Sequence, residues 1–211
     1  MSQQHTEDTI TVYSDYVCPF CFLGRHALST YQDTRDGDLE IDWRPFDLRA
    51  QKRRPDGSLD LSVDDGKDDA YYEQAKQGVR RLQEKYGVEM NLDLATDVDS
   101  FPAQVASLYA KQHYPYEQWL DFDVAVFEAL WQENRDIGDE DVLVDLAESV
   151  GIDGDEIRSA LDDDTLHDHL REEFDVARRN GITGVPTFTY EGYVARGAVP
   201  PEQLERLVEG V

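Results

Sequence analysis

Every segment of this 211-residue sequence that is typical of a β-strand lies near one end of the chain. Apolar residues alternate with polar ones, or β-branched and aromatic residues cluster, in four short runs. These runs are residues 10–13, 39–44, 187–190 and 193–195. The pair Glu191-Gly192 is typical of the hairpin turn between the last two. One sheet built from both ends of the chain requires the residues between them to form an insertion.

The remainder of the sequence is predicted to be mainly helical. Apolar side chains recur at helical spacing in segments after residue 21 and over 72–86, 101–109, 119–131, 142–150, 164–181 and 202–208. Ser100 is expected to cap the helix that starts at Phe101, and residues 47–69 form a long polar connection. The fold class is therefore α/β with an all-helical insertion, divided as residues 1–48, 49–163 and 164–211.

The charge of the chain excludes several classes of partner. Asp and Glu number 46 against 20 Lys and Arg, which gives a net charge of −26. Such a surface repels nucleic acids and anionic lipid headgroups. Asp outnumbers Glu by 29 to 17 and Arg outnumbers Lys by 15 to 5. This bias predicts a protein that works in molar salt, with an acidic protein of ordinary cytosol as the alternative.

Targeting signals are not apparent in the sequence. The first ten residues have neither a basic segment nor an apolar run, and no stretch of 18 apolar residues occurs. We therefore expect a soluble cytoplasmic protein that does not associate with membranes.

The reactive chemistry is concentrated in Cys18-Pro19-Phe20-Cys21, which holds the only two cysteines. They lie where the first strand meets the first helix. Backbone N–H groups and the positive end of the dipole at a helix start favour thiolate over thiol. Residues at i and i+3 of a helix are close enough to form a disulfide after a small adjustment. Cys18 is predicted to be the exposed nucleophile and Cys21 the resolving thiol, with Pro19 at the first helical position.

Other uses of two cysteines fit this pattern less well. A zinc site needs about four ligands, and no second CxxC or suitable histidine pair is present, so we expect no metal. A static disulfide would close too short a loop to add much stability and is disfavoured in a reducing cytosol. A pair of merely buried thiols would not require a proline directly after the first cysteine.

A second motif, Gly181-Ile182-Thr183-Gly184-Val185-Pro186-Thr187-Phe188, places a proline immediately before a predicted strand. Together with the Cys-Pro-Phe-Cys motif, it closely resembles the thioredoxin-fold oxidoreductases. The helical insertion and the segments Ser14 to Gly24 and Gly197 to Glu202 are similar to those of the DsbA-type family, in its FrnE-like branch. The resemblance covers essentially the whole chain, and it is specific in the two motifs and weak in the helical block.

The resemblance implies roles for individual residues. Cys18 would exchange with a substrate disulfide, Cys21 would resolve the mixed disulfide, and Pro186 would be cis against them. The Val185 backbone would pair with an extended substrate segment, beside Pro19 and Phe20. Phe20 replaces the Trp usual in that branch and the His of strongly oxidising members, which argues against a strongly oxidising centre.

Two further side chains are candidates near the cysteines. A carboxylate at Asp15 would raise the pKa of the Cys18 thiol, although Asp15 can equally serve only to end the strand. His26 could approach the site from the first helix, with an ordinary exposed histidine as the alternative.

The sequence therefore predicts a dithiol–disulfide oxidoreductase acting on protein or small-molecule disulfides. No dissociable cofactor is expected, with glutathione possible as reductant or co-substrate. Two alternatives remain open. One is a glutathione-dependent isomerase or transferase of the 2-hydroxychromene-2-carboxylate isomerase or kappa type, which generally uses a single nucleophile. The other is a non-enzymatic redox sensor or chaperone. The oligomeric state is not predicted.

Overall fold

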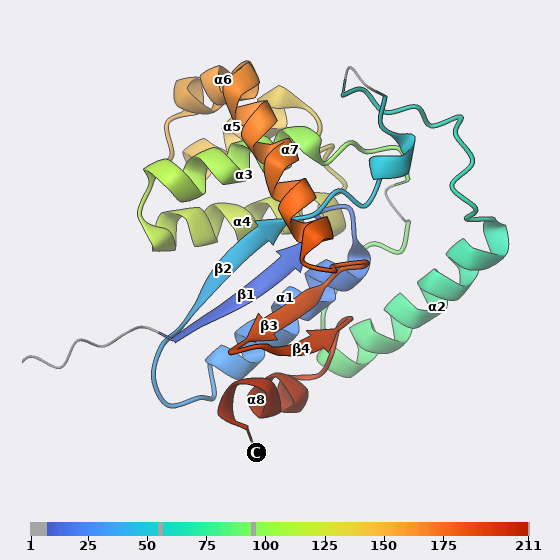
Figure 1. The fold of residues 1–211 in the computed structure, drawn as a ribbon, viewed down its shortest axis with the longest axis vertical. Coiled ribbons are helices and arrows are strands. Elements are labelled where there is room, and N and C mark those ends of the chain that lie inside the picture. Colours follow the sequence, from blue (N-terminus) through green and yellow to red (C-terminus); the bar gives the residue numbers. More distant parts are fainter. Residues whose placement is uncertain (1–7, 55–56, 94–95, 211) are drawn as a thin grey trace, which may run out of the picture.

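A four-stranded mixed sheet lies at the centre of the computed structural model, which describes residues 8–54, 57–93 and 96–210 (Figure 1). Its strands are β1 (Asp8–Ser14), β2 (Leu39–Pro45), β3 (Thr187–Tyr190) and β4 (Tyr193–Arg196). The order across the sheet is β2-β1-β3-β4. The pair β1/β2 is parallel, whereas β1/β3 and β3/β4 are antiparallel. Both ends of the chain therefore build one sheet, as the strand pattern predicted.

Alternation along the strands fixes which faces are buried. In β2, Leu39, Ile41 and Trp43 are buried while the residues between them are half-buried. Val12 in β1 pairs with Trp43 on one side and Phe188 on the other, so apolar side chains from three strands meet at the same level. A shift by one residue would turn this set to the opposite face.

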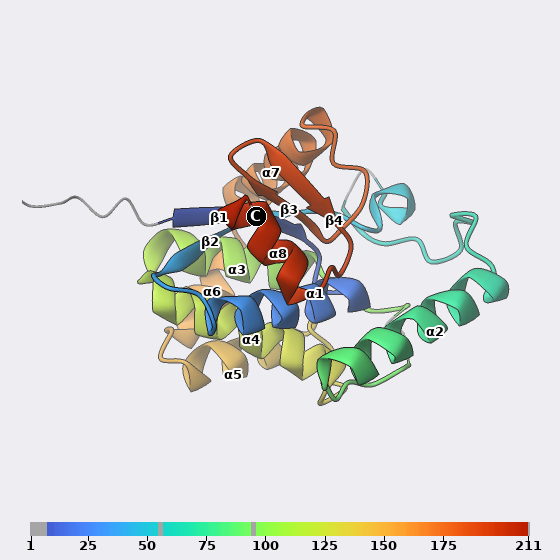
Figure 2. The ribbon, with the colours of Figure 1, turned by 90° about the horizontal axis from the view of Figure 1, so that it is seen from below.

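Helices cover both faces of the sheet. The helices are α1 (Pro19–Gln32), α2 (Asp69–Tyr86), α3 (Phe101–His113), α4 (Tyr116–Trp131), α5 (Glu140–Ser149), α6 (Gly154–Leu161), α7 (Asp164–Arg179) and α8 (Pro201–Glu209). Figure 2 shows α7 on one side of the strands and α1 and α8 on the other. The helix α7 contacts β2 and α3, and α8 packs against α1.

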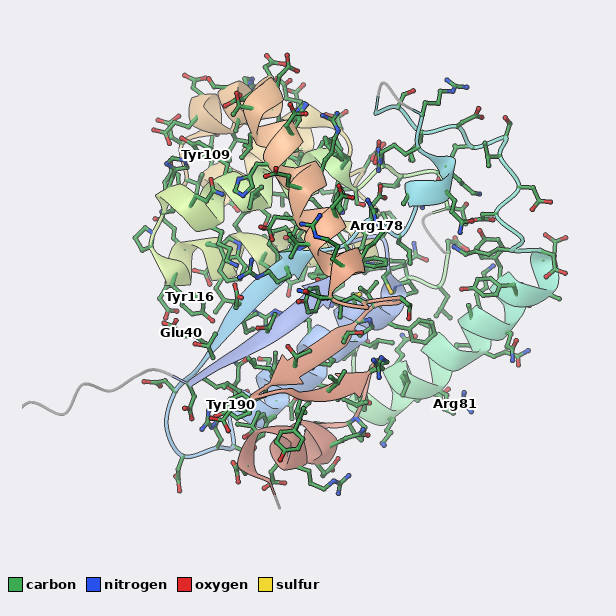
Figure 3. All side chains as sticks on the ribbon, in the orientation of Figure 1. Glu40, Arg81, Tyr109, Tyr116, Arg178 and Tyr190 are labelled. Carbon is green, nitrogen blue, oxygen red and sulfur yellow. The ribbon has the colours of Figure 1, made fainter. Side chains whose placement is uncertain are left out.

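The residues between β2 and α7 form two separate helical parts. The helices α3 to α6 make a block beside β2, and α2 lies on the other side of the molecule, where it contacts α1 (Figure 1). Tyr116 of α4 joins the block to the sheet, because its hydroxyl accepts a hydrogen bond of 2.8 Å from the Ile41 backbone N–H (Figure 3). The domain boundaries at 48/49 and 163/164 remain a prediction.

Most of the predicted elements are confirmed, with two exceptions. The helix α6 was not predicted, and the polar connection contains a short 3₁₀ helix, η1 (Ala50–Lys52). The N-terminal segment over residues 1–7, from which no leader was expected, lies outside the described residues. None of the described helices is both long enough and apolar enough to span a membrane.

Candidate active site

The two cysteines lie at the start of α1, directly after the connection from β1. Cys18 is the N-cap residue, with φ −92° and ψ 112°, and Pro19 follows at the first helical position. Proline suits this position because the N–H it lacks would have no partner inside the helix. The backbone N–H groups of Cys21 and Phe22 both donate to the Cys18 carbonyl, at 3.0 and 3.3 Å. The first turn of α1 thus places Cys21 behind Cys18.

Both cysteines are free thiols and both are buried, with exposed fractions of 4% for Cys18 and 2% for Cys21. The prediction that Cys18 is exposed is therefore wrong. The reason is that Cys18 lies in the wall of a cavity of about 500 Å³ between the start of α1, the 183–185 loop and the start of α2. A substrate sulfur must enter this cavity to reach Cys18, whereas Cys21 does not line it.

The two thiols hydrogen-bond to each other, with the Cys21 S–H as donor to the Cys18 sulfur. Burial raises the pKa of Cys21 well above its usual range, the hydrogen bond that Cys21 donates to Cys18 raises it further, and ionisation of Cys18 would raise it again. Desolvation disfavours a thiolate that has no water around it. Cys21 therefore keeps its proton until a base removes it.

The loop before β3 faces Cys18 from the opposite side. The Val185–Pro186 peptide bond is cis, and the Cys18 thiol donates to the Val185 carbonyl over 3.6 Å. Pro186 is buried, and its own carbonyl accepts a 2.8 Å bond from the Gly197 N–H. Gly24 of α1 allows this approach, because a Cβ atom there would lie only 3.1 Å from Pro186 Cγ.

Asp15 lies buried beneath the cysteines, at the end of β1, with an exposed fraction of 0%. Its carboxylate accepts hydrogen bonds from the backbone N–H of Leu48 at 2.8 Å and of Val17 at 3.3 Å, and from the Ser100 hydroxyl. Burial raises the pKa of Asp15 to about 6 from 3.8, against the lowering by these three donors. The Asp15 backbone N–H also bonds the Cys21 sulfur, and the Asp15 charge raises the pKa of Cys21.

Ser100 departs from the prediction that it caps α3. Its side chain makes no capping bond, and Asp99 Oδ1 accepts from the Phe101 N–H instead, at 2.9 Å. Ser100 and Gln104, both buried, continue the polar contacts of Asp15 into α3. The sequence carried no signal for this contact, because Ser100 lies 85 positions from Asp15 along the chain.

The other predicted residues divide between the cavity and the surface. Pro19, Phe20 and Val185 line the cavity, and the ring of Phe20 also lies against Gly78 of α2. His26 is exposed on α1 and does not line the cavity. The structure therefore places His26 on the surface, outside the cavity that Cys18 lines.

Sequence reasoning missed the opposite wall of the cavity. The connection before α2 was predicted only as polar, yet it supplies three cations to the lining: Arg49, Lys52 and Lys67. Tyr71 and Tyr72 at the start of α2 complete this wall. Across the described ranges, no three His, Cys, Asp or Glu side chains are grouped so that they could hold a metal ion.

A dithiol at the start of a helix, opposite a proline loop that leads into an inner strand of a sheet with this strand order, defines a thioredoxin-like redox site. The model of the DSBA-like thioredoxin domain family matches residues 9–209. The chain belongs to this family. It is also 35% identical over 205 residues to the uncharacterized protein YwbO of Bacillus subtilis (strain 168), with 94% of each chain covered.

Solved structures share the fold over nearly the whole chain. A probable DsbA oxidoreductase from Streptomyces coelicolor has a TM-score of 0.77 at 24% identity, covering 96% of this chain and 88% of its own. A 2-hydroxychromene-2-carboxylate isomerase has a TM-score of 0.74 at 20% identity, covering 93% and 92%. The cytosolic disulfide reductase DsbM of Pseudomonas aeruginosa, solved with GSH, has 0.63 at 20%, covering 94% and 92%. At these identities the likeness establishes the fold.

Proposed function

We propose that this protein is a thiol–disulfide oxidoreductase whose reacting groups are Cys18 and Cys21. The observation that carries the proposal is the placement of the two sulfurs. Cys18 lines the cavity beside the Val185 carbonyl, and Cys21 lies behind it, hydrogen-bonded to Cys18 and closed off from the cavity. Membership of the DSBA-like family supports the same chemistry.

The reaction proceeds in two displacements. The Cys18 thiolate attacks one sulfur of a substrate disulfide, which forms a mixed disulfide and releases the other sulfur as a thiolate that takes up a proton. Cys21, once deprotonated, attacks the Cys18 sulfur, which breaks the mixed disulfide and releases the second substrate thiol. Two electrons pass from the protein to the substrate, and a Cys18–Cys21 disulfide remains. The reverse sequence oxidises a substrate dithiol.

Asp15 is the base in the second displacement. Cys21 has a strongly raised pKa and needs a proton acceptor inside the protein. The Asp15 carboxylate is buried, interacts electrostatically with Cys21, and has a pKa of about 6. A carboxylate with a raised pKa is a better base near neutral pH than an ordinary one. The proton that Cys21 releases thus has an acceptor inside the protein.

A glutathione-dependent isomerase is the second candidate, because the fold is shared with the 2-hydroxychromene-2-carboxylate isomerase. Such chemistry needs one nucleophile at the Cys18 position. The second thiol, and a buried carboxylate next to it, have no role in that reaction. The arrangement around Cys21 therefore favours exchange over isomerisation. A redox sensor that does not turn over would use the same two thiols.

Several finer features belong to the proposal. We place the chain in the FrnE-like branch on its segments Ser14 to Gly24 and Gly197 to Glu202, and in a salt-rich cytoplasm on its net charge of −26. The cytosolic disulfide reductase DsbM, which has this fold, supports that location. The substrate is a protein or small-molecule disulfide, the reaction needs no dissociable cofactor, and glutathione is a candidate reductant.

Single replacements of the two cysteines test the function. Cys21→Ser should attack a model disulfide and then remain as a mixed disulfide, because no resolving thiol is left. Cys18→Ser should neither attack nor become trapped, because Cys21 is screened from the cavity. The measurement is intact-protein mass spectrometry after mixing with oxidised glutathione, alongside turnover with a thiol reductant.

The outcomes separate the candidates. Loss of multiple turnover in Cys21→Ser, with the trapped adduct on Cys18, supports the dithiol mechanism. Full turnover in Cys21→Ser, together with isomerisation of a chromene substrate, would instead establish the isomerase. Attack by a wild-type protein that never turns over would identify a sensor.

A further inference from the structure

The cavity next to Cys18 differs in charge from the rest of the molecule. The whole chain carries a net charge of −26, yet the cavity lining contains Arg49, Lys52 and Lys67 against the two acids Asp47 and Asp65. Three of the 20 Lys and Arg residues thus line the one cavity that contains the reactive sulfur. The cavity lining thus carries more cations than acids on a molecule in which acids outnumber cations by more than two to one.

The two lysines share a single carboxylate. Lys52 Nζ and Lys67 Nζ each lie 3.4 Å from the same oxygen, Asp65 Oδ2. The side chains are largely buried, with exposed fractions of 16% for Lys52, 28% for Lys67 and 12% for Asp65. Two ammonium groups held by one carboxylate leave one positive charge without a counter-charge within this triad.

The other acid of the lining does not cancel that charge. Asp47 is engaged by Arg53, whose Nε and Nη2 donate to its two carboxylate oxygens at 2.8 and 3.3 Å. Arg53 itself is not part of the cavity lining. The Lys52–Asp65–Lys67 triad is therefore a site at which a further carboxylate would be stabilised, in a partly desolvated position where charge interactions are screened less.

We propose that the cavity recognises a small disulfide that carries carboxylates, with one carboxylate bound at Lys52 and Lys67 while a substrate sulfur reaches Cys18. This inference rests on the proposed exchange function. A cavity of about 500 Å³ has the size of a site for a small peptide-like molecule. The tyrosines Tyr71 and Tyr72 supply an apolar wall for the body of such a ligand.

The charge of the substrate can be varied while its disulfide chemistry is kept. Oxidised glutathione is anionic and cystamine is cationic. The reduced protein is mixed with each disulfide, and the second-order rate constant for loss of the protein thiols is measured. This rate constant is divided by the rate constant of free dithiothreitol with the same disulfide, which corrects for the intrinsic reactivity of the disulfide. The field of a −26 molecule favours cystamine, so a preference for oxidised glutathione has to arise locally.

Variants of the triad should change this preference in opposite directions. The double variant Lys52→Gln/Lys67→Gln should lower the ratio of the oxidised glutathione rate to the cystamine rate at least fivefold. Asp65→Asn removes the competing carboxylate, and should raise the ratio at least threefold. Lys76→Gln is the matched control, because Lys76 pairs with Glu73 on α2 and does not line the cavity. It should leave the ratio unchanged.

The directions distinguish recognition from damage to the fold, because damage would slow both substrates in all variants. An unchanged ratio in the double variant and in Asp65→Asn overturns the inference, as does a wild-type protein that reacts rapidly only with a protein disulfide such as insulin. A wild-type protein that reacts with none of these disulfides contradicts the proposed function itself. Reaction with both small disulfides at ratios insensitive to the triad contradicts only the inference.

Discussion

The pKa of Asp15 results from opposing effects on one buried carboxyl group. Burial raises it, and hydrogen bonds from Ser100, Leu48 and Val17 lower it, to a net value of about 6. Gln104 fixes the direction of one of these bonds. Its Nε2 donates to Ser100 Oγ at 3.3 Å, so the Ser100 hydrogen is left to point at Asp15. The side chain can therefore ionise near neutral pH without leaving the core.

Replacement of Asp15 by Asn should slow the second displacement more than the first. The amide keeps the shape of the carboxyl group but cannot accept the Cys21 proton. We expect the mixed disulfide on Cys18 to decay about 10²- to 10⁴-fold more slowly, which is the usual contribution of a positioned proton acceptor. In the wild type this decay should accelerate as the pH rises through 6, and in Asp15→Asn that step should disappear. Quenched-flow trapping of the adduct measures both steps, and an unchanged decay profile would remove Asp15 from the mechanism.

The same residue gives the folding stability a defined pH dependence. The native pKa is about 6 and the ordinary value is 3.8, so the native state holds a proton that the unfolded chain has lost between these values. The free energy of unfolding therefore falls as the pH rises through this window, by about 3 kcal/mol for the full shift. The free energy of unfolding of Asp15→Asn should not show this fall, because the amide does not ionise. In urea denaturation, the free energy of unfolding of Asp15→Asn should therefore rise relative to that of the wild type from pH 4 to pH 7.

A matched exposed position provides the control for this prediction. Asp162 is exposed at the end of α6, so Asp162→Asn removes one carboxylate from the surface without changing the core. The dependence on pH should be larger for Asp15→Asn than for this variant. If the stability of Asp15→Asn differs from that of the wild type by the same amount at every pH, Asp15 does not bear the shifted pKa.

At the scale of elements, glycines set how closely α1 approaches its neighbours. A Cβ on Gly24 would lie 3.1 Å from Pro186 Cγ and 3.2 Å from Phe188 Cζ, both buried. A Cβ on Gly78 of α2 would lie 3.3 Å from the far end of the Phe20 ring. The proline ring and the buried phenylalanine have little room to move, whereas Phe20 borders the cavity.

The two glycines therefore make a matched pair for substitution. Both are inside helices, so alanine gains about 1 kcal/mol of helix propensity at either position. Gly24→Ala should nevertheless be destabilised, by about 1–3 kcal/mol of overpacking, and should lose exchange activity because the Pro186 loop is displaced. Gly78→Ala should be neutral or more stable. Thermal unfolding and exchange assays measure both, and equal stabilisation of the two variants would contradict the tight contact at Gly24.

The elements also show where the sequence was informative. Strands β1 and β2 and the long helices were predictable because their apolar residues repeat with a clear period. The helix α6 has only eight residues, which is too short for a helical period of apolar residues to be visible. Its one local signal is Asp153, whose side chain caps the start of the helix. The cavity wall was not predictable, because residues 47–67 have no period. Their path is fixed by distant ion pairs, such as Arg53 with Asp99.

On the scale of the whole molecule, a buried polar network joins the helical block to the cysteine segment. The Tyr16 hydroxyl lies 2.8 Å from Ser107 Oγ and 2.9 Å from Asp123 Oδ1. Arg25 of α1 donates to Asp123 at 3.2 Å, and Trp131 of α4 donates to the Tyr16 carbonyl at 2.8 Å. Burial raises the pKa of Tyr16 well above its usual range, as does the charge of Asp123, so Tyr16 stays neutral. The block therefore holds the backbone two residues before Cys18.

The net charge of −26 acts on the molecule as a whole. Acidic side chains repel one another more strongly in the compact state than in the extended chain. The Debye length falls from about 10 Å at 0.1 M salt to about 3 Å at 1 M, which removes most of this repulsion. We expect the melting temperature to rise by more than about 10 °C between dilute buffer and 2 M KCl, given that about 1 kcal/mol corresponds to 2–4 °C in a chain of this size.

A variant with fewer acids separates screening from other effects of salt. Glu128, Glu172 and Glu205 are exposed and lie outside the ion pairs found among the described residues. Changing all three to Gln lowers the net negative charge by three. This variant should melt higher than the wild type in dilute buffer, and the difference should shrink as KCl is added, because self-repulsion is then screened in both. Sucrose, which stabilises by exclusion without screening charge, should preserve the difference. A melting temperature that is flat in KCl, or a difference that persists at 2 M, would show that self-repulsion does not limit the stability of this fold.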